Sequence, residues 1–98
     1  MRGIIVGNTY EKAAKKLDRM IKDYQNFWNI KPQTIMKNKL QYKVLFENND
    51  VWEILSTNSN ARGHKCNILL VDIDIPEEIV WELRSNIIYI PYGGISYY

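Results

Sequence analysis

Four consecutive apolar residues, Ile68–Val71, are followed directly by an acidic residue, Asp72. An unbroken apolar run of this length is typical of a strand that is buried on both faces, as in a parallel sheet covered by helices. In open α/β sheets, ligands bind at the carboxyl ends of the strands. The run therefore predicts a central strand over residues 66–75, with Asp72 at the edge of the sheet where a ligand would bind.

Strand-like and helix-like patterns alternate before this strand. A β-branched run at residues 4–6 predicts a buried strand. Apolar residues at three- and four-residue spacing then predict an amphipathic helix over residues 9–28, with Asn8 as its N-cap. Residues 31–40 are polar and basic and are expected to form a loop or a short strand. The alternation and central turn of residues 41–55 predict a β-hairpin.

After the central strand, Pro76 and two glutamates mark the start of a second helix. Residues 87–90 are expected to form a last strand, and residues 95–98 a short tail. The predicted order of elements is β-α-β-β-β-α-β. It indicates a single α/β domain over residues 1–98, a small sandwich with a mainly parallel central sheet and the β-hairpin at one edge.

Composition excludes several classes of protein. No apolar run approaches the roughly 18 residues of a membrane span, and the N-terminus lacks the pattern of a signal peptide. Cys66 is the only cysteine and His64 the only histidine, so neither an internal disulfide nor a cysteine-rich zinc site is expected. These features favour a cytoplasmic protein that makes no membrane contact.

Charge is distributed unevenly along the chain. Residues 1–43 contain ten Lys or Arg and three acidic residues, whereas residues 44–98 contain three basic and eight acidic residues. Such asymmetry indicates either a nucleic-acid-binding face or a solvated lysine-rich helix. If it is a binding face, the expected nucleic-acid-binding residues are Lys12, Lys15, Lys16, Arg19, Lys22, Arg62 and Lys65.

The order of three segments resembles the ATPase domain of phage large terminases, the DNA-packaging motors. These segments are the strand and turn at residues 4–13, the hairpin at residues 43–56, and the Ala-Arg-Gly turn at residues 61–63 before the strand that ends at Asp72. The resemblance covers residues 3–83. It implies a fold similar to that of P-loop NTPases, a phage or prophage origin and a role connected with DNA packaging.

Two features of that family are missing from this chain. The phosphate loop G-x-x-x-x-G-K-[ST] does not occur, and Ile73 stands where the family has a glutamate that activates water. The resemblance therefore predicts a non-catalytic protein with a partial terminase-like fold and no cofactor. Its partner would be DNA or a protein, such as a packaging motor, a replication ATPase or a host defence factor.

Two alternatives remain open from the sequence. Asp72 and Asp74, two residues apart, would share one face of a strand and could hold Mg²⁺ in a metal-dependent nuclease or an ATPase subunit completed by another subunit. The second alternative is a structural homo-oligomer that covers an exposed sheet edge. The role of Arg62 is also open: it would either bind a phosphate or pair with one of the two aspartates.

Overall fold

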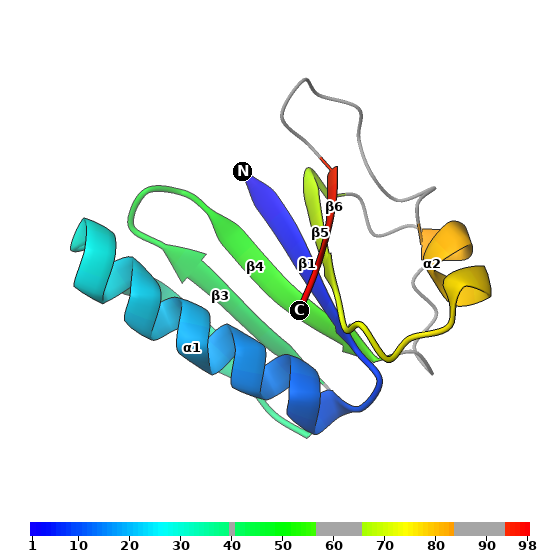
Figure 1. The fold of residues 1–98 in the computed structure, drawn as a ribbon. Coiled ribbons are helices and arrows are strands. Elements are labelled where there is room, and N and C mark those ends of the chain that lie inside the picture. The colour runs from blue at the N-terminus through cyan, green and yellow to red at the C-terminus, as the bar shows by residue number, and fades with distance from the viewer. Residues whose placement is uncertain (40, 57–65, 84–93) are drawn as a thin grey trace.

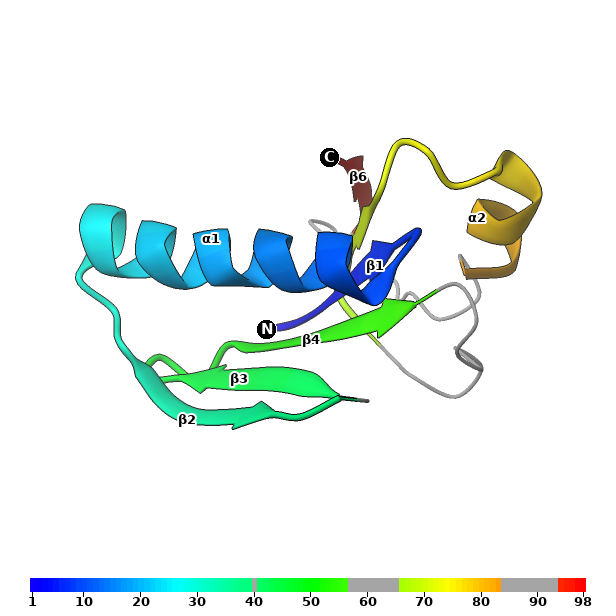
Figure 2. The ribbon, with the colours of Figure 1, turned by 90° about the horizontal axis from the view of Figure 1, so that it is seen from below.

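The structure is a computed structural model that describes residues 1–39, 41–56, 66–83 and 94–98. Figures 1 and 2 show a twisted sheet with a long helix and a short helix packed on it. The elements follow in the order β1 (Arg2–Gly7), α1 (Tyr10–Trp28), β2 (Pro32–Lys37), β3 (Tyr42–Phe46), β4 (Val51–Ser56), β5 (Ile68–Val71), α2 (Glu77–Leu83) and β6 (Gly94–Tyr97). Within the described residues, neither helix has the length and apolar character needed to cross a membrane.

In the part of the chain that the structure describes, the sheet has six strands in the order β2-β3-β4-β1-β5-β6. The neighbours β4-β1, β1-β5 and β5-β6 are parallel, whereas β2-β3 and β3-β4 are antiparallel. The α/β class and the β3-β4 hairpin are confirmed, but the sheet is mixed rather than mainly parallel. The reason is that short connections join β2 to β3 and β3 to β4, and a parallel pair needs a crossover of a dozen or more residues.

Three further details differ from the sequence-based expectation. β6 is a strand where a tail was expected, and β5 covers only Ile68–Val71 of the strand expected over residues 66–75. β2 is a strand, one of the two forms expected for residues 31–40. The N-cap of α1 is Thr9 rather than Asn8, because the Thr9 Oγ1 accepts a hydrogen bond from the Lys12 backbone N–H at 3.2 Å. The strand expected at residues 87–90 lies outside the described residues.

Among the described residues, α1 and α2 cover opposite faces of the sheet, as the alternation of side chains along β1 shows. Ile5 packs under α1, whereas Ile4 and Val6 face α2. The expected sandwich arrangement is therefore present. The core under α1 contains Ile5, Ala13, Ala14, Leu17, Tyr24, Tyr42, Val44, Phe46, Trp52 and Ile54. The core under α2 contains Ile4, Val6, Cys66, Leu69, Val71, Ile75, Val80 and Leu83.

Gly7 allows the first turn of α1 to close on the end of β1. A Cβ atom at this position would lie 2.6 Å from the Thr9 carbonyl oxygen and 2.7 Å from the Ala13 backbone nitrogen. Both obstacles are backbone atoms, which do not yield as the end of a flexible side chain does. The tight turn between β1 and α1 therefore requires glycine.

Gly7→Ala is expected to lower the free energy of unfolding by about 1–3 kcal/mol, the usual cost of overpacking. Urea denaturation measures this change. Gly94→Ala is the matched control, since an added Cβ there meets no atom of the described residues within 4 Å. Equal midpoints for the wild type and Gly7→Ala would contradict the packing described here.

Candidate functional site

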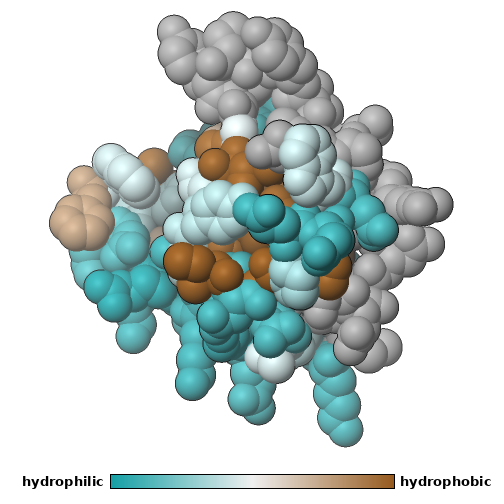
Figure 3. Space-filling view, turned by 45° about the vertical axis from the view of Figure 1, so that its right-hand side comes forward, coloured by the Kyte–Doolittle hydropathy of each residue, from teal (hydrophilic) through white to brown (hydrophobic). Residues whose placement is uncertain are grey.

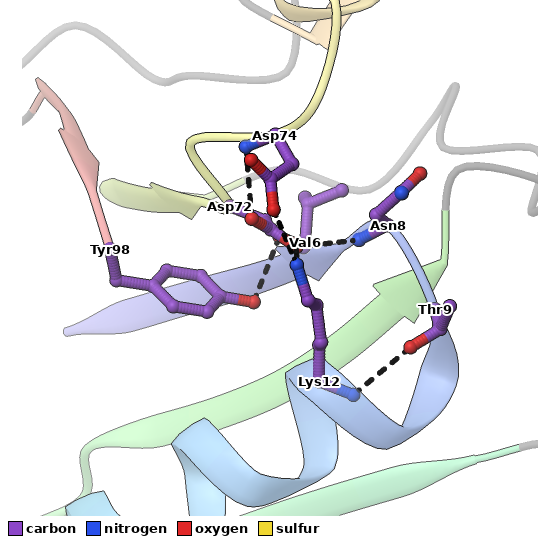
Figure 4. Close-up of polar contacts among 7 residues, drawn as sticks. All are labelled: Val6, Asn8, Thr9, Lys12, Asp72, Asp74 and Tyr98. Atoms are coloured by element: carbon purple, nitrogen blue, oxygen red, sulfur yellow. Dashed lines mark hydrogen bonds and ion pairs between the residues drawn. The ribbon is translucent and has the colours of Figure 1, made fainter.

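The carboxyl ends of β1 and β5 meet beside the start of α1 (Figure 4). Val6 lies opposite Val71 in the parallel register, and the Asp72 N–H donates to the Val6 carbonyl at 2.9 Å. This pairing brings Asp72 next to the turn at Gly7 and Asn8. The position expected for Asp72, at the end of a parallel strand next to β1, is confirmed.

Asp72 is buried, and protein donors surround its carboxylate. Its Oδ2 accepts from the Asn8 backbone N–H at 3.2 Å, and its Oδ1 accepts from the Asp74 backbone N–H at 3.0 Å. Burial disfavours the charged form, but the two backbone N–H groups and Lys12 outweigh it and hold the pKa of Asp72 below its ordinary value. The carboxylate is therefore an ionised anion at the N-terminal end of α1.

Lys12 supplies the cation for this anion and for its neighbour. The Lys12 Nζ lies 2.6 Å from Asp74 Oδ2 and 3.2 Å from Asp72 Oδ2. Hydrogen bonds to Asp74 and to Asp72 raise the pKa of Lys12. The structure thus places Lys12 between the two carboxylates that the sequence suggested as metal ligands (Figure 4).

The arrangement of Asp72 and Asp74 does not suit a divalent ion as it stands. Mg²⁺ would have to displace the Lys12 ammonium, and it needs about six oxygen ligands. In the described parts of the chain, no group of three or more His, Cys, Asp or Glu side chains converges to supply them. Ile73, between the two aspartates, is apolar and exposed, so it provides no general base.

Tyr98 lies over the same strand ends. Its backbone N–H donates to the Val71 carbonyl at 3.0 Å, and its carbonyl accepts from the Ile73 N–H at 2.9 Å. Its hydroxyl donates to the Val6 carbonyl at 3.0 Å. Burial, and then the charge of Asp72, raise the pKa of Tyr98 to about 12, so the hydroxyl stays protonated at neutral pH. The tyrosine is held at both its backbone and its hydroxyl.

A cleft of about 500 Å³ separates α1 from Tyr98. We call it the α1–Tyr98 cleft; its lining residues are Lys12, Lys15, Lys16, Arg19, Asp23 and Tyr98. Four of the cations expected to bind nucleic acid therefore line one concave surface. In Figure 3, hydrophilic side chains project along the lower part of the face where α1 lies, with hydrophobic surface above them.

The cations of the cleft differ in how far they are neutralised. Lys12 is paired with two carboxylates, and the Arg19 Nε lies 3.8 Å from Asp23 Oδ1 in a solvent-exposed pair. Among the described residues, the structure gives no ion pair to Lys15 or Lys16. The Lys16 Nζ instead lies 5.7 Å from the centroid of the Tyr98 ring. Positive charge in the cleft is therefore incompletely neutralised.

The other expected binding residues lie elsewhere. Lys22 is exposed on α1 but does not line the cleft. Arg62 and Lys65 lie outside the described residues. Tyr98 was not among the expected site residues, although two adjacent tyrosines at residues 97 and 98 were a signal, because burial alone does not readily explain such a pair.

Comparisons of this chain with protein-family models, curated proteins and solved structures found no match.

Proposed function

We infer that this chain is a non-catalytic nucleic-acid-binding domain, with DNA as its partner, and that it binds through the α1–Tyr98 cleft. The observation that carries this proposal is the convergence of Lys15, Lys16 and Arg19 on one cleft. Lysine and arginine side chains that contact phosphates release condensed counterions, which is the main source of affinity for nucleic acids.

The two aspartates support a binding function more than a catalytic one. Asp72 and Asp74 share the Lys12 ammonium, so a cation of the chain itself offsets part of the negative charge at this edge of the sheet. Asp72 also stands at the N-terminal end of α1, where a phosphate would otherwise bind. We therefore assign Asp72 and Lys12 to the structure of the site, and phosphate contacts to the next two turns of α1.

The sequence resemblance to the ATPase domain of phage large terminases agrees with DNA as the partner. On this proposal the chain is a phage or prophage protein that has kept a DNA-handling fold without the phosphate loop. Protein partners such as a packaging motor would then be reached through DNA or through another surface.

The test is the salt dependence of DNA binding. Fluorescence anisotropy with a labelled oligonucleotide is expected to show affinity that falls steeply between about 50 and 200 mM salt. Lys15→Glu combined with Arg19→Glu should weaken binding at every salt concentration. It should also make the slope of log affinity against log salt less steep by about 1.5, since each lost phosphate contact removes about 0.7–0.9.

Lys31→Glu combined with Lys39→Glu is the matched control, because it makes the same change in net charge at exposed lysines away from the cleft. This control is expected to retain most of the wild-type affinity and slope. Failure of the wild type to bind DNA at low salt would overturn the proposal. So would equal losses of affinity in the two double variants.

A further inference from the structure

The α1–Tyr98 cleft has two chemically different walls. One wall is the cationic face of α1, and the other is the ring of Tyr98. Phosphate contacts alone require only cations, so an aromatic ring opposite them indicates a ligand that has both an anionic and a flat apolar part.

The Tyr98 ring is fixed in position before any ligand arrives. Tyr98 forms hydrogen bonds to Val71 and Ile73 through its backbone and to Val6 through its hydroxyl. These bonds leave the ring half-buried at the edge of the cleft, with the Lys16 ammonium 5.7 Å from its centroid. Stacking on a ring that is already immobilised costs little conformational entropy.

We propose that the α1–Tyr98 cleft binds single-stranded nucleic acid, with one base stacked on the Tyr98 ring and the adjoining phosphates on Lys15, Lys16 and Arg19. This inference rests on the proposed function and specifies its ligand. In a duplex the bases are stacked on one another and their faces are unavailable, whereas a single strand presents base faces and phosphates together. On binding, Lys16 moves from the ring to a phosphate and the base takes its place.

Tyr98→Leu is expected to lower affinity for a single-stranded oligonucleotide by roughly 5- to 150-fold, the effect of removing one base–aromatic stack. The salt slope should stay unchanged, because no cation is lost. Tyr98→Phe keeps the ring and should bind within about twofold of the wild type. Tyr97→Leu is the matched control, since Tyr97 is exposed and does not line the cleft.

A second measurement needs no substitution. The wild type is expected to bind a single strand at least about tenfold more tightly than a duplex of the same sequence, because only the single strand gains the stacking energy of one base on the Tyr98 ring. An oligonucleotide carrying 5-bromouracil, irradiated in the complex, should crosslink to Tyr98, and mass spectrometry of the digested complex identifies the residue. This measurement keeps the inference testable if Tyr98→Leu does not fold.

The outcomes separate the two proposals. Equal affinity for single strand and duplex, with Tyr98→Leu no weaker than Tyr97→Leu, would overturn single-strand binding and leave the DNA-binding proposal standing. A crosslink confined to residues away from the cleft would overturn the inference as well. Absence of binding to both forms would overturn the proposed function itself.

Discussion

Phe46→Ala is expected to lower the free energy of unfolding by about 3–5 kcal/mol, the range for removing a buried phenylalanine side chain. Phe46 is fully buried under α1, and its ring stacks on Tyr24 with the centroids 3.9 Å apart. The substitution therefore leaves a cavity and removes an aromatic contact. For a domain whose whole stability is about 5–15 kcal/mol, this loss brings the protein close to unfolding.

Tyr24 makes the cavity difficult to fill by rearrangement. Its hydroxyl accepts from Trp52 Nε1 at 2.9 Å and donates to Asp50 Oδ2 at 2.9 Å. Moving Tyr24 into the space left by Phe46 would break these two hydrogen bonds, one of them buried. The core can collapse only in part, so the cavity cost remains near the upper end of the range.

Urea denaturation at neutral pH measures the effect, and Phe27→Ala is the matched control. Phe27 is 75% exposed near the end of α1, so its loss should change stability by less than about 0.5 kcal/mol. Similar midpoints for the two alanine variants would show that Phe46 does not hold α1 to the sheet as described.

The elements that the sequence predicted well are those with one or two buried faces. β5 is an apolar run because one of its faces is buried in the core under α2 and the other is half-buried against the core under α1. β3 alternates because Tyr42, Val44 and Phe46 point toward α1. The second helix also follows its pattern, with Val80 and Leu83 buried. In each case, the burial of side chains requires a pattern of apolar residues that can be recognised in the sequence alone.

The strands at the two sheet edges lack this signal. Side chains of β2 are exposed or half-buried along its whole length, with Ile35 and Met36 each 50% exposed, so no alternation marks it as a strand. β6 has no fully buried residue either. Both strands form because a neighbouring strand supplies backbone hydrogen-bond partners. This is a tertiary effect, which cannot be predicted from the local β-propensity of the sequence.

The position of the site could be predicted from the sequence, but the ion pairs within it could not. Parallel strands bring their carboxyl ends to one edge, so the position of Asp72 beside the Gly7–Asn8 turn followed from the predicted order of elements. The contact between Lys12 and Asp74 did not follow. Lys12 matched the other cations of α1 in pattern, and only the structure shows that its ammonium faces two carboxylates.

Asp72→Asn is expected to lower the free energy of unfolding by about 3 kcal/mol at neutral pH. The Asp72 carboxylate accepts backbone hydrogen bonds from Asn8 and Asp74 and pairs with Lys12, and hydrogen bonds to a charged group contribute about 1.5–3 kcal/mol each. Asparagine has one acceptor oxygen and no charge, so it keeps at most part of this network. The loss would loosen the end of β5 and the start of α1 together.

Acid should reduce the difference in the free energy of unfolding between Asp72→Asn and the wild type. The pKa of Asp72 is lower in the folded than in the unfolded protein, so its stabilisation is complete above about pH 4, the ordinary pKa of aspartate, and is lost as the pH falls through the folded value. The urea denaturation midpoints of the two proteins should therefore lie closer together at low pH than at neutral pH. Asp74→Asn is the matched control: Asp74 is exposed and its backbone N–H still donates to Asp72, so only a small change is expected at any pH. A stability difference for Asp72→Asn that stays constant from neutral to acid pH would mean that the carboxylate is not ionised against Lys12 in the folded protein.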